Sequence, residues 1–188
     1  TAKTRELRVA AHAHTTAGIN LALQAGVDSI EHASWLNDTS YQLLLESGGY
    51  IVPTLMVKDM IRNGLDRRDP ATRMRLERSL VEHPRRVAEA FAAGVKIASG
   101  SDAGVVPHGR NARELEWYVD IGLSEMEAIV TATVNASALL GQSDHLGTLE
   151  PGKLADVIAV SASPLENISE LLNVDFVMKA GQVYKHEN

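Results

Sequence analysis

The chain has 188 residues, a formal charge of -6 and 45% hydrophobic residues, which is enough for one ordinary domain with a mostly aliphatic core. The acidic balance and the lack of a dense Lys/Arg stripe argue against nucleic acid as a partner. No run reaches the roughly 18 apolar residues of a membrane span, and there is no cysteine, so we expect no membrane partner and no disulfide framework.

Strands and helices alternate along the first two thirds of the chain. Strands are expected at residues 8–14, 28–33, 50–55 and 96–102, and helices at 17–25, 37–45, on both sides of Asp69-Pro70, at 112–121 and at 124–140. Ser124 with Glu127 has the pattern of a helix capping box. This βαβα order predicts an α/β fold with a parallel sheet. The tail is richer in short strands, which are expected at 155–160, 176–179 and 182–185.

Polar groups that can bind a metal stand at the ends of the expected strands. His12 and His14 are two residues apart, so a strand places both imidazoles on one face. His32 ends the second strand and Asp102 the fourth, and α/β enzymes place their chemistry at such carboxyl ends. Two imidazoles and a carboxylate form a set typical of catalytic zinc, with Asp102 as the proton acceptor for a metal-activated water. The third strand ends in Thr54, which could only assist.

Each of these residues also has a purely structural interpretation. His12 could be a core histidine bonded to backbone, His32 could simply end a strand, and Asp102 could be a turn residue. Glu31 is expected to point away from His32 into a salt bridge. Three metal-competent strand ends in one sheet nevertheless favour a site. His108 should overhang that site from the loop after the fourth strand. The remaining histidines are expected on the surface: His83, His145 and His186.

Three short motifs at the strand ends carry a resemblance. Residues 9–15 (VAAHAHT), 29–33 (SIEHA) and 99–104 (SGSDAG) resemble the fifth, sixth and eighth strand motifs of the amidohydrolase superfamily. The similarity continues to residues 146–157 and 177–183, and so covers nearly the whole chain. The resemblance places the chain near the imidazolonepropionase-like branch, with the metal-dependent prolidases and the Xaa-Arg/Lys carboxypeptidases and dipeptidases.

The resemblance implies a fold and a cofactor. Residues 1–145 would form the carboxyl-terminal half of a (β/α)8 TIM-type barrel, strands five to eight, and residues 146–188 part of a small β-sandwich. The cofactor would be Zn2+, as one or two ions. The superfamily's first-strand His-x-His pair and its carboxylated lysine have no counterpart here. Because the chain also starts at Thr1 rather than Met, we expect a fragment whose missing amino-terminal half, or a second chain, completes the barrel.

The resemblance also implies a role for each site residue. His12, His32 and Asp102 would bind the metal, with Asp102 also the catalytic general base and acid, and His14 and His108 would bind substrate. The implied activity is metal-dependent hydrolysis of amide C–N bonds in dipeptides or N-acyl amino acids, with cyclic amides and phosphotriesters as competing substrates. The alternative is an inert half-barrel, and the isolated chain is expected to be inactive. We expect a small-molecule substrate as partner and a homo-oligomer. The sequence leaves the localisation unknown, with the cytoplasm favoured.

Overall fold

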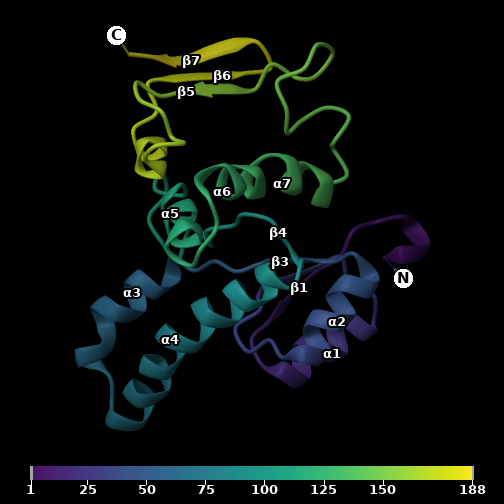
Figure 1. Ribbon diagram of the computed structural model, residues 1–188, viewed down its shortest axis with the longest axis vertical. Helices are drawn as coiled ribbons and strands as arrows, with labels where there is room; N and C mark the ends of the chain where they lie inside the picture. Colours follow the sequence, from purple (N-terminus) through teal and green to yellow (C-terminus); the bar gives the residue numbers. More distant parts are fainter. Residues whose placement is uncertain (1, 188) are drawn as a thin grey trace. The chain divides into compact units, whose positions relative to one another are not determined.

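The computed structural model describes residues 2–187 and divides into two compact units, residues 1–107 and 108–188 (Figure 1). This division differs from the boundary expected after residue 145, because the helices after Pro107 belong to the same unit as the carboxyl-terminal sheet. The assignment of the expected domains to a barrel and a sandwich stays a prediction. Among the described residues, no helix is both long and apolar enough to span a bilayer.

The first unit is built around a four-stranded parallel sheet in the order β1-β2-β3-β4. The strands are β1 Ala10–Ala13, β2 Ser29–His32, β3 Tyr50–Val52 and β4 Lys96–Ile97. The helices are α1 Thr16–Gln24, α2 Asp38–Ser47, α3 Val57–Gly64 and α4 Pro70–Ala92, with short 3-10 turns at Lys3–Arg5 and Leu65–Arg67. The expected α/β alternation and parallel pairing are confirmed. The strands are shorter than expected, so several polar residues at their ends lie in the loops that follow.

The two faces of this sheet differ in chemistry. Ile30, Ile51 and Ile97 pair with one another across neighbouring strands and are buried. Their face carries the apolar core, because side chains of paired residues point the same way. The next row pairs His12 with Glu31 and therefore lies on the opposite face. That second face is partly polar, which is unusual for a parallel sheet.

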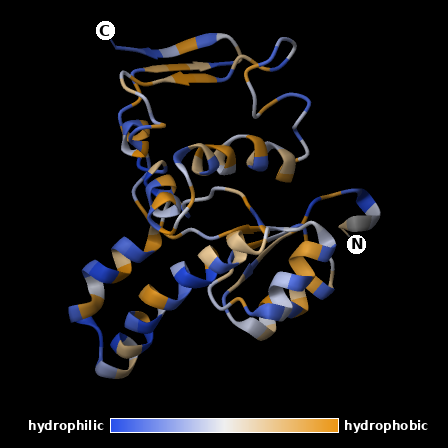
Figure 2. Ribbon diagram, viewed as in Figure 1, coloured by the Kyte–Doolittle hydropathy of each residue, from blue (hydrophilic) through white to orange (hydrophobic). Residues whose placement is uncertain are grey.

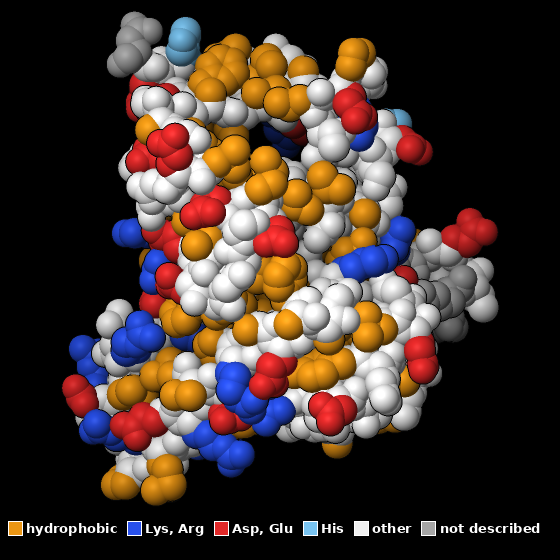
Figure 3. Space-filling model, viewed as in Figure 1, with side chains coloured by type: hydrophobic (Ala, Val, Ile, Leu, Met, Phe, Trp, Pro, Cys, Tyr) orange, Lys and Arg blue, Asp and Glu red, His pale blue; other side chains and the backbone are white. Residues whose placement is uncertain are grey.

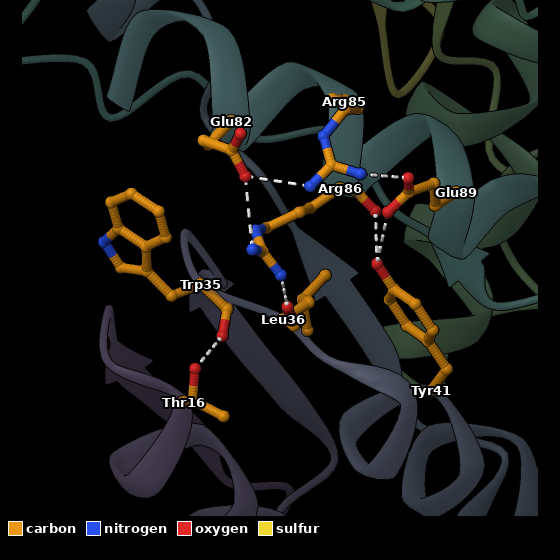
Figure 4. Close-up of polar contacts among 8 residues, drawn as sticks. All are labelled: Thr16, Trp35, Leu36, Tyr41, Glu82, Arg85, Arg86 and Glu89. Carbon is orange, nitrogen blue, oxygen red and sulfur yellow. Dashed lines mark hydrogen bonds and ion pairs between the residues drawn. The ribbon is translucent and has the colours of Figure 1, made fainter. Parts of the chain in front are cut away.

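Long-range polar contacts tie α4 to α2 and to the segment just before α2 (Figure 4). Tyr41 Oη donates to the Arg86 carbonyl oxygen over 3.2 Å, and the Arg86 guanidinium donates to the Leu36 carbonyl oxygen. Glu82 pairs with both Arg85 and Arg86, at 2.8 and 3.2 Å. These contacts hold α4 beside the strand ends, across sequence separations of 45 and 50 residues.

The hairpin of α3 and α4 is largely hydrophilic (Figure 2), and Lys and Arg side chains gather over it (Figure 3). The expected helix break at Asp69-Pro70 is confirmed. The Asp69 side chain accepts from the Thr72 backbone N–H at 3.0 Å, and Pro70 is the first residue of α4. Proline suits this position because the first helical N–H has no partner within the helix.

The second unit combines helices with a three-stranded antiparallel sheet in the order β5-β6-β7. Its elements are α5 Arg113–Asp120, α6 Glu125–Ala132, α7 Val134–Leu139, β5 Val157–Ala159, a 3-10 turn at Ile168–Leu172, β6 Phe176–Lys179 and β7 Gln182–His186. The capping box of Ser124 and Glu127 is confirmed. The single helix expected over residues 124–140 is wrong, since Thr133 leaves helical geometry with φ -120 and ψ -86. Its hydroxyl donates to the Ile129 carbonyl oxygen at 2.8 Å, a local bond that often accompanies a helix bend.

Candidate metal centre

Three histidines converge at the carboxyl ends of β1 and β2. One nitrogen each from His12, His14 and His32 lies within 4.8 Å of the others. The ring centroids of His12 and His32 are 4.4 Å apart, and those of His14 and His32 are 4.7 Å apart. His12 and His14 share a face because they are two residues apart on an extended chain.

The backbone leaves strand geometry where the polar residues stand. His32 has φ 69, Thr54 has φ 54 and Asp102 has φ 55, all in the left-handed region. Residues other than glycine seldom adopt this region, and each instance costs about 1–3 kcal/mol. For His32 the turn takes its ring out of the regular alternation, where Glu31 and not His32 shares the face of His12. Backbone strain of this kind is common at functional sites, where a particular side chain is needed and glycine cannot replace it.

Thr54 determines which nitrogen of His32 carries the proton. Its Oγ1 lies 2.7 Å from His32 Nδ1 and also donates to the Pro53 carbonyl oxygen at 2.7 Å. With its single proton directed to the Pro53 carbonyl oxygen, Oγ1 accepts from Nδ1–H of His32. The lone pair of His32 is therefore on Nε2, which faces His12 Nδ1 at 2.9 Å. His14 is oriented separately, by a contact of 2.9 Å between its Nδ1 and Ser34 Oγ.

This arrangement fits a zinc-type cation. Two nitrogen ligands on a tetrahedral Zn2+ are about 3.3 Å apart when the bonds are about 2.0–2.1 Å, close to the separation of His12 Nδ1 and His32 Nε2. Imidazole ligands suit borderline ions such as Zn2+. A metal-binding histidine usually donates its other ring N–H to an oxygen acceptor, and here the Thr54 hydroxyl is in the position to act as that acceptor for His32.

The electrostatics keep two of these rings neutral. Burial, followed by the neighbouring His14 and His12, lowers the pKa of His32 to about 4. Partial burial also lowers the pKa of His14, followed by the effects of His12 and Lys58. The charge of Asp102 raises the pKa of both rings, so its carboxylate is within electrostatic reach of them. Neutral imidazoles present lone pairs at pH 7 without first releasing a proton.

Two other residues expected at the site, Asp102 and His108, are not part of the histidine cluster among the described residues. The carbonyl oxygen of Asp102 accepts from the backbone N–H groups of Val105 and Val106 at 3.0 and 3.3 Å, so its backbone forms the turn considered from the sequence. His108 is exposed and begins the second unit. The roles assigned to His12, His14, His32, Asp102 and His108 stay predictions.

Two expectations about neighbouring residues are wrong. Glu31 has no ion pair in the described residues; its carboxylate accepts from the Ser29 hydroxyl at 2.6 Å, and burial raises its pKa. His83, expected on the surface, is only 2% exposed, and among the described residues neither ring nitrogen has a hydrogen-bond partner. Its spacing to Val87 and Ala90 on α4 marks a buried stripe, a signal that could have revealed it. His145 and His186 are exposed as expected.

A cavity of about 480 Å³ opens beside the cluster and contains a residue that the sequence reasoning missed. Lys58 of α3 is only 5% exposed, and its Nζ donates to Ser79 Oγ of α4 at 2.8 Å. A lysine directly after the mostly apolar residues 50–57, which begin with β3, was the available signal. The cavity is lined by residues of the first unit: His14, Thr15, His32, Ser34, Trp35, Thr54, Val57, Lys58, Ile61, Arg75, Leu76, Ser79 and His83.

Comparisons with known proteins agree with this geometry. The profile described as "Amidohydrolase family" matches residues 1–184, and the chain belongs to this family. Ochratoxinase of Aspergillus niger is 37% identical over 186 residues, which are 94% of this chain and 38% of that protein. Imidazolonepropionase of Symbiobacterium thermophilum is 30% identical over 149 residues, 77% of this chain and 30% of that protein.

The fold is shared with solved structures. A crystal structure of a Xaa-Pro dipeptidase with bound methionine superposes with a TM-score of 0.92 at 39% identity. The match covers 98% of this chain and 46% of that one. The chain therefore spans less than half the length of these relatives. The amidohydrolase family is generally metal-dependent, and the three-histidine cluster is a group that could bind a metal.

Proposed function

We propose that this chain is part of a metal-dependent hydrolase of amide C–N bonds, acting on dipeptides or N-acyl amino acids. The observation that carries the proposal is the cluster of His12, His14 and His32 at the carboxyl ends of parallel strands. The tautomer of His32 and the lowered pKa values of His14 and His32 support a metal role for the cluster. Similarity to ochratoxinase and to a Xaa-Pro dipeptidase supports the amide bond as the target.

In this proposal each side chain has a defined task. His12 and His32 hold Zn2+ through Nδ1 and Nε2, and Thr54 keeps the proton of His32 on Nδ1. The ion, when bound, polarises the scissile carbonyl and lowers the pKa of water. A carboxylate oxygen of Asp102 takes the proton of the attacking water and returns it to the leaving nitrogen. His14 and His108 contact the substrate.

We also propose that the sheet is the carboxyl-terminal half of a (β/α)8 barrel, with residues 146–188 in a small β-sandwich. The face that carries His12 and Glu31 supports this. Parallel sheets normally have both faces covered, and closure into a barrel would cover this one. The other half would supply the further histidine pair and the carboxylated lysine, and the protein would be a homo-oligomer in the cytoplasm. Cyclic-amide hydrolysis is the second candidate, supported by the similarity to imidazolonepropionase.

Metal content and hydrolysis test the proposal together. In the holoenzyme, His12→Ala should lower bound zinc, measured by elemental analysis, and abolish release of amino acids from a panel of dipeptides. His145→Ala is the matched control, because His145 is an exposed histidine outside the cluster. Unchanged zinc in His12→Ala would remove His12 from the metal centre. Zinc-loaded protein that hydrolyses neither linear nor cyclic amides would favour the inert half-barrel.

A further inference from the structure

The cavity beside the histidine cluster is rich in hydrogen-bond donors and cations. His14, His32 and Thr54 line it from the strand ends, and the α3–α4 hairpin supplies about half of the lining residues. Among the described residues, those that line it include no aspartate or glutamate. Its volume of about 480 Å³ is within the range of about 300–1,000 Å³ that is typical of small-molecule sites.

Lys58 places a buried positive charge in this cavity without a counter-charge. Its bond to the Ser79 hydroxyl is neutral, and within residues 2–187 no carboxylate forms an ion pair with it. Burial lowers the pKa of Lys58 to about 8, so the ammonium group is still mostly protonated at neutral pH. Lysine is almost never fully buried unless it is paired. A ligand that brings a negative charge would supply the missing partner.

His83 and Arg75 point to the same ligand independently. His83 is buried against the cavity, and neither of its ring nitrogens has a hydrogen-bond partner among the described residues. An imidazole ring carries at least one N–H in either protonation state, so His83 can act as a donor. Arg75 lines the cavity from α4 and has no ion pair in the described part of the chain, whereas the nearby Arg73 is paired with Glu77 at 2.8 Å.

We propose that this cavity binds the free carboxylate on the amino-acid side of the substrate, with Lys58 as its main partner and Arg75 and His83 as further donors. The proposal rests on the proposed function, since the amide to be cut must lie at the histidine end of the same cavity. Lys58 is then a specificity-determining residue. The substrates are acyl amino acids and dipeptides with an unmodified carboxyl group, and the side chain of the amino acid lies against the apolar residues Trp35, Ile61 and Leu76.

The test compares pairs of compounds that differ only at the carboxylate. The holoenzyme is given the N-acetyl derivatives of leucine, phenylalanine and proline and of the three corresponding amino alcohols, and acetate release is measured. Loss of a buried charge pair changes affinity by about 100-fold, so wild type should prefer each acid to its alcohol by about that factor in kcat/KM. In Lys58→Met the ratio of acid to alcohol should fall about 100-fold. Arg68→Gln, an exposed arginine of the same hairpin that does not line the cavity, should keep the wild-type ratio.

Two further variants cover the case that Lys58→Met does not fold. Lys58→Arg should retain most of the preference, and Arg75→Gln at the exposed side of the cavity should reduce it by about tenfold. An equal loss of activity on acids and alcohols, or a wild type that does not discriminate, overturns the carboxylate role.

Calorimetric binding of the same compounds separates this proposal from the proposed function. If nothing is hydrolysed but wild type binds the acids more tightly than the alcohols and Lys58→Met does not, the hydrolase proposal fails and the carboxylate site stands. Hydrolysis without any preference for the acids supports the hydrolase and overturns the carboxylate site. A wild type that binds none of the acids overturns it as well.

Discussion

Replacement of Thr54 by valine tests the proposed link between the tautomer of His32 and metal binding. Valine has the shape of threonine but cannot accept the proton of His32 Nδ1, which lies 2.7 Å from the hydroxyl. Thr54 is 5% exposed, so water cannot easily replace the lost acceptor. An unpaired buried donor costs about 1–3 kcal/mol, and loss of a partner behind a metal-binding histidine weakens binding by about 10–100-fold. These two magnitudes agree, since a tenfold change is about 1.4 kcal/mol.

The assay is competition for Zn2+ between the protein and a chromophoric chelator. Thr54→Val should raise the dissociation constant for Zn2+ by about 10–100-fold. Thr54→Ser is the matched control: it keeps the hydroxyl and should bind within about threefold of wild type. Equal zinc affinity in wild type and Thr54→Val would refute the reasoning, as would a Thr54→Ser variant that binds as weakly as Thr54→Val.

Three further perturbations test the same site and its support. The folded-state pKa of His32 is about 4, against an unfolded value of about 6.5, so the metal-free protein should lose stability as pH falls from about 6.5 to 4. Denaturant titrations at several pH values should show this loss. In His32→Asn the loss of stability over the same pH range should be smaller. His83→Leu should leave the free energy of unfolding unchanged or raise it by about 1 kcal/mol. Val87→Ala on the same stripe should lower it by about 1–3 kcal/mol. A large loss of stability in His83→Leu would mean that the His83 ring has a structural partner. Gly100→Ala should lower the free energy of unfolding by about 1–3 kcal/mol, because the added methyl carbon would lie 2.4 Å from Val52 Cγ1. In the double variant with Val52→Ala, the two losses of stability should be less than additive. Strict additivity would contradict the clash.

Local patterns in the sequence account for much of this fold. The alternation of short apolar runs with helical periodicity predicts the parallel sheet, and Asp69-Pro70 and the pair of Ser124 and Glu127 mark helix starts that the structure confirms. These features depend on neighbours within one helical turn, so a reader of the sequence can see them. The errors arise where a distant contact or a competing local bond decides, as at Thr133, whose hydroxyl bends a helix that its apolar pattern would continue.

The same distinction holds for the candidate site. The spacing of His12 and His14 by itself determined that the two rings share a face, and the motifs around His32 and Asp102 indicated a metal-dependent enzyme. The cavity could not be read in this way, because Lys58 and His83 come from two helices that packing brings beside the strand ends. Burial of a charge or an imidazole depends on what covers it, and here the cover is α4, held by the contacts of Tyr41 and Arg86 across 45 and 50 residues.

The sequence alone thus determined the type of fold, since strand alternation is a local property, and it indicated His12 and His32 as candidate metal ligands. Asp102, the third expected ligand, is not part of the histidine cluster in the described residues, and His14 is. Only the tertiary structure decided how they act together. It turned His32 toward His12 through a left-handed backbone, placed the proton of His32 through a hydroxyl 22 residues away, and enclosed Lys58 without a counter-charge. Each of these depends on atoms that are distant in the chain and adjacent in space, where hydrogen bonding and desolvation act.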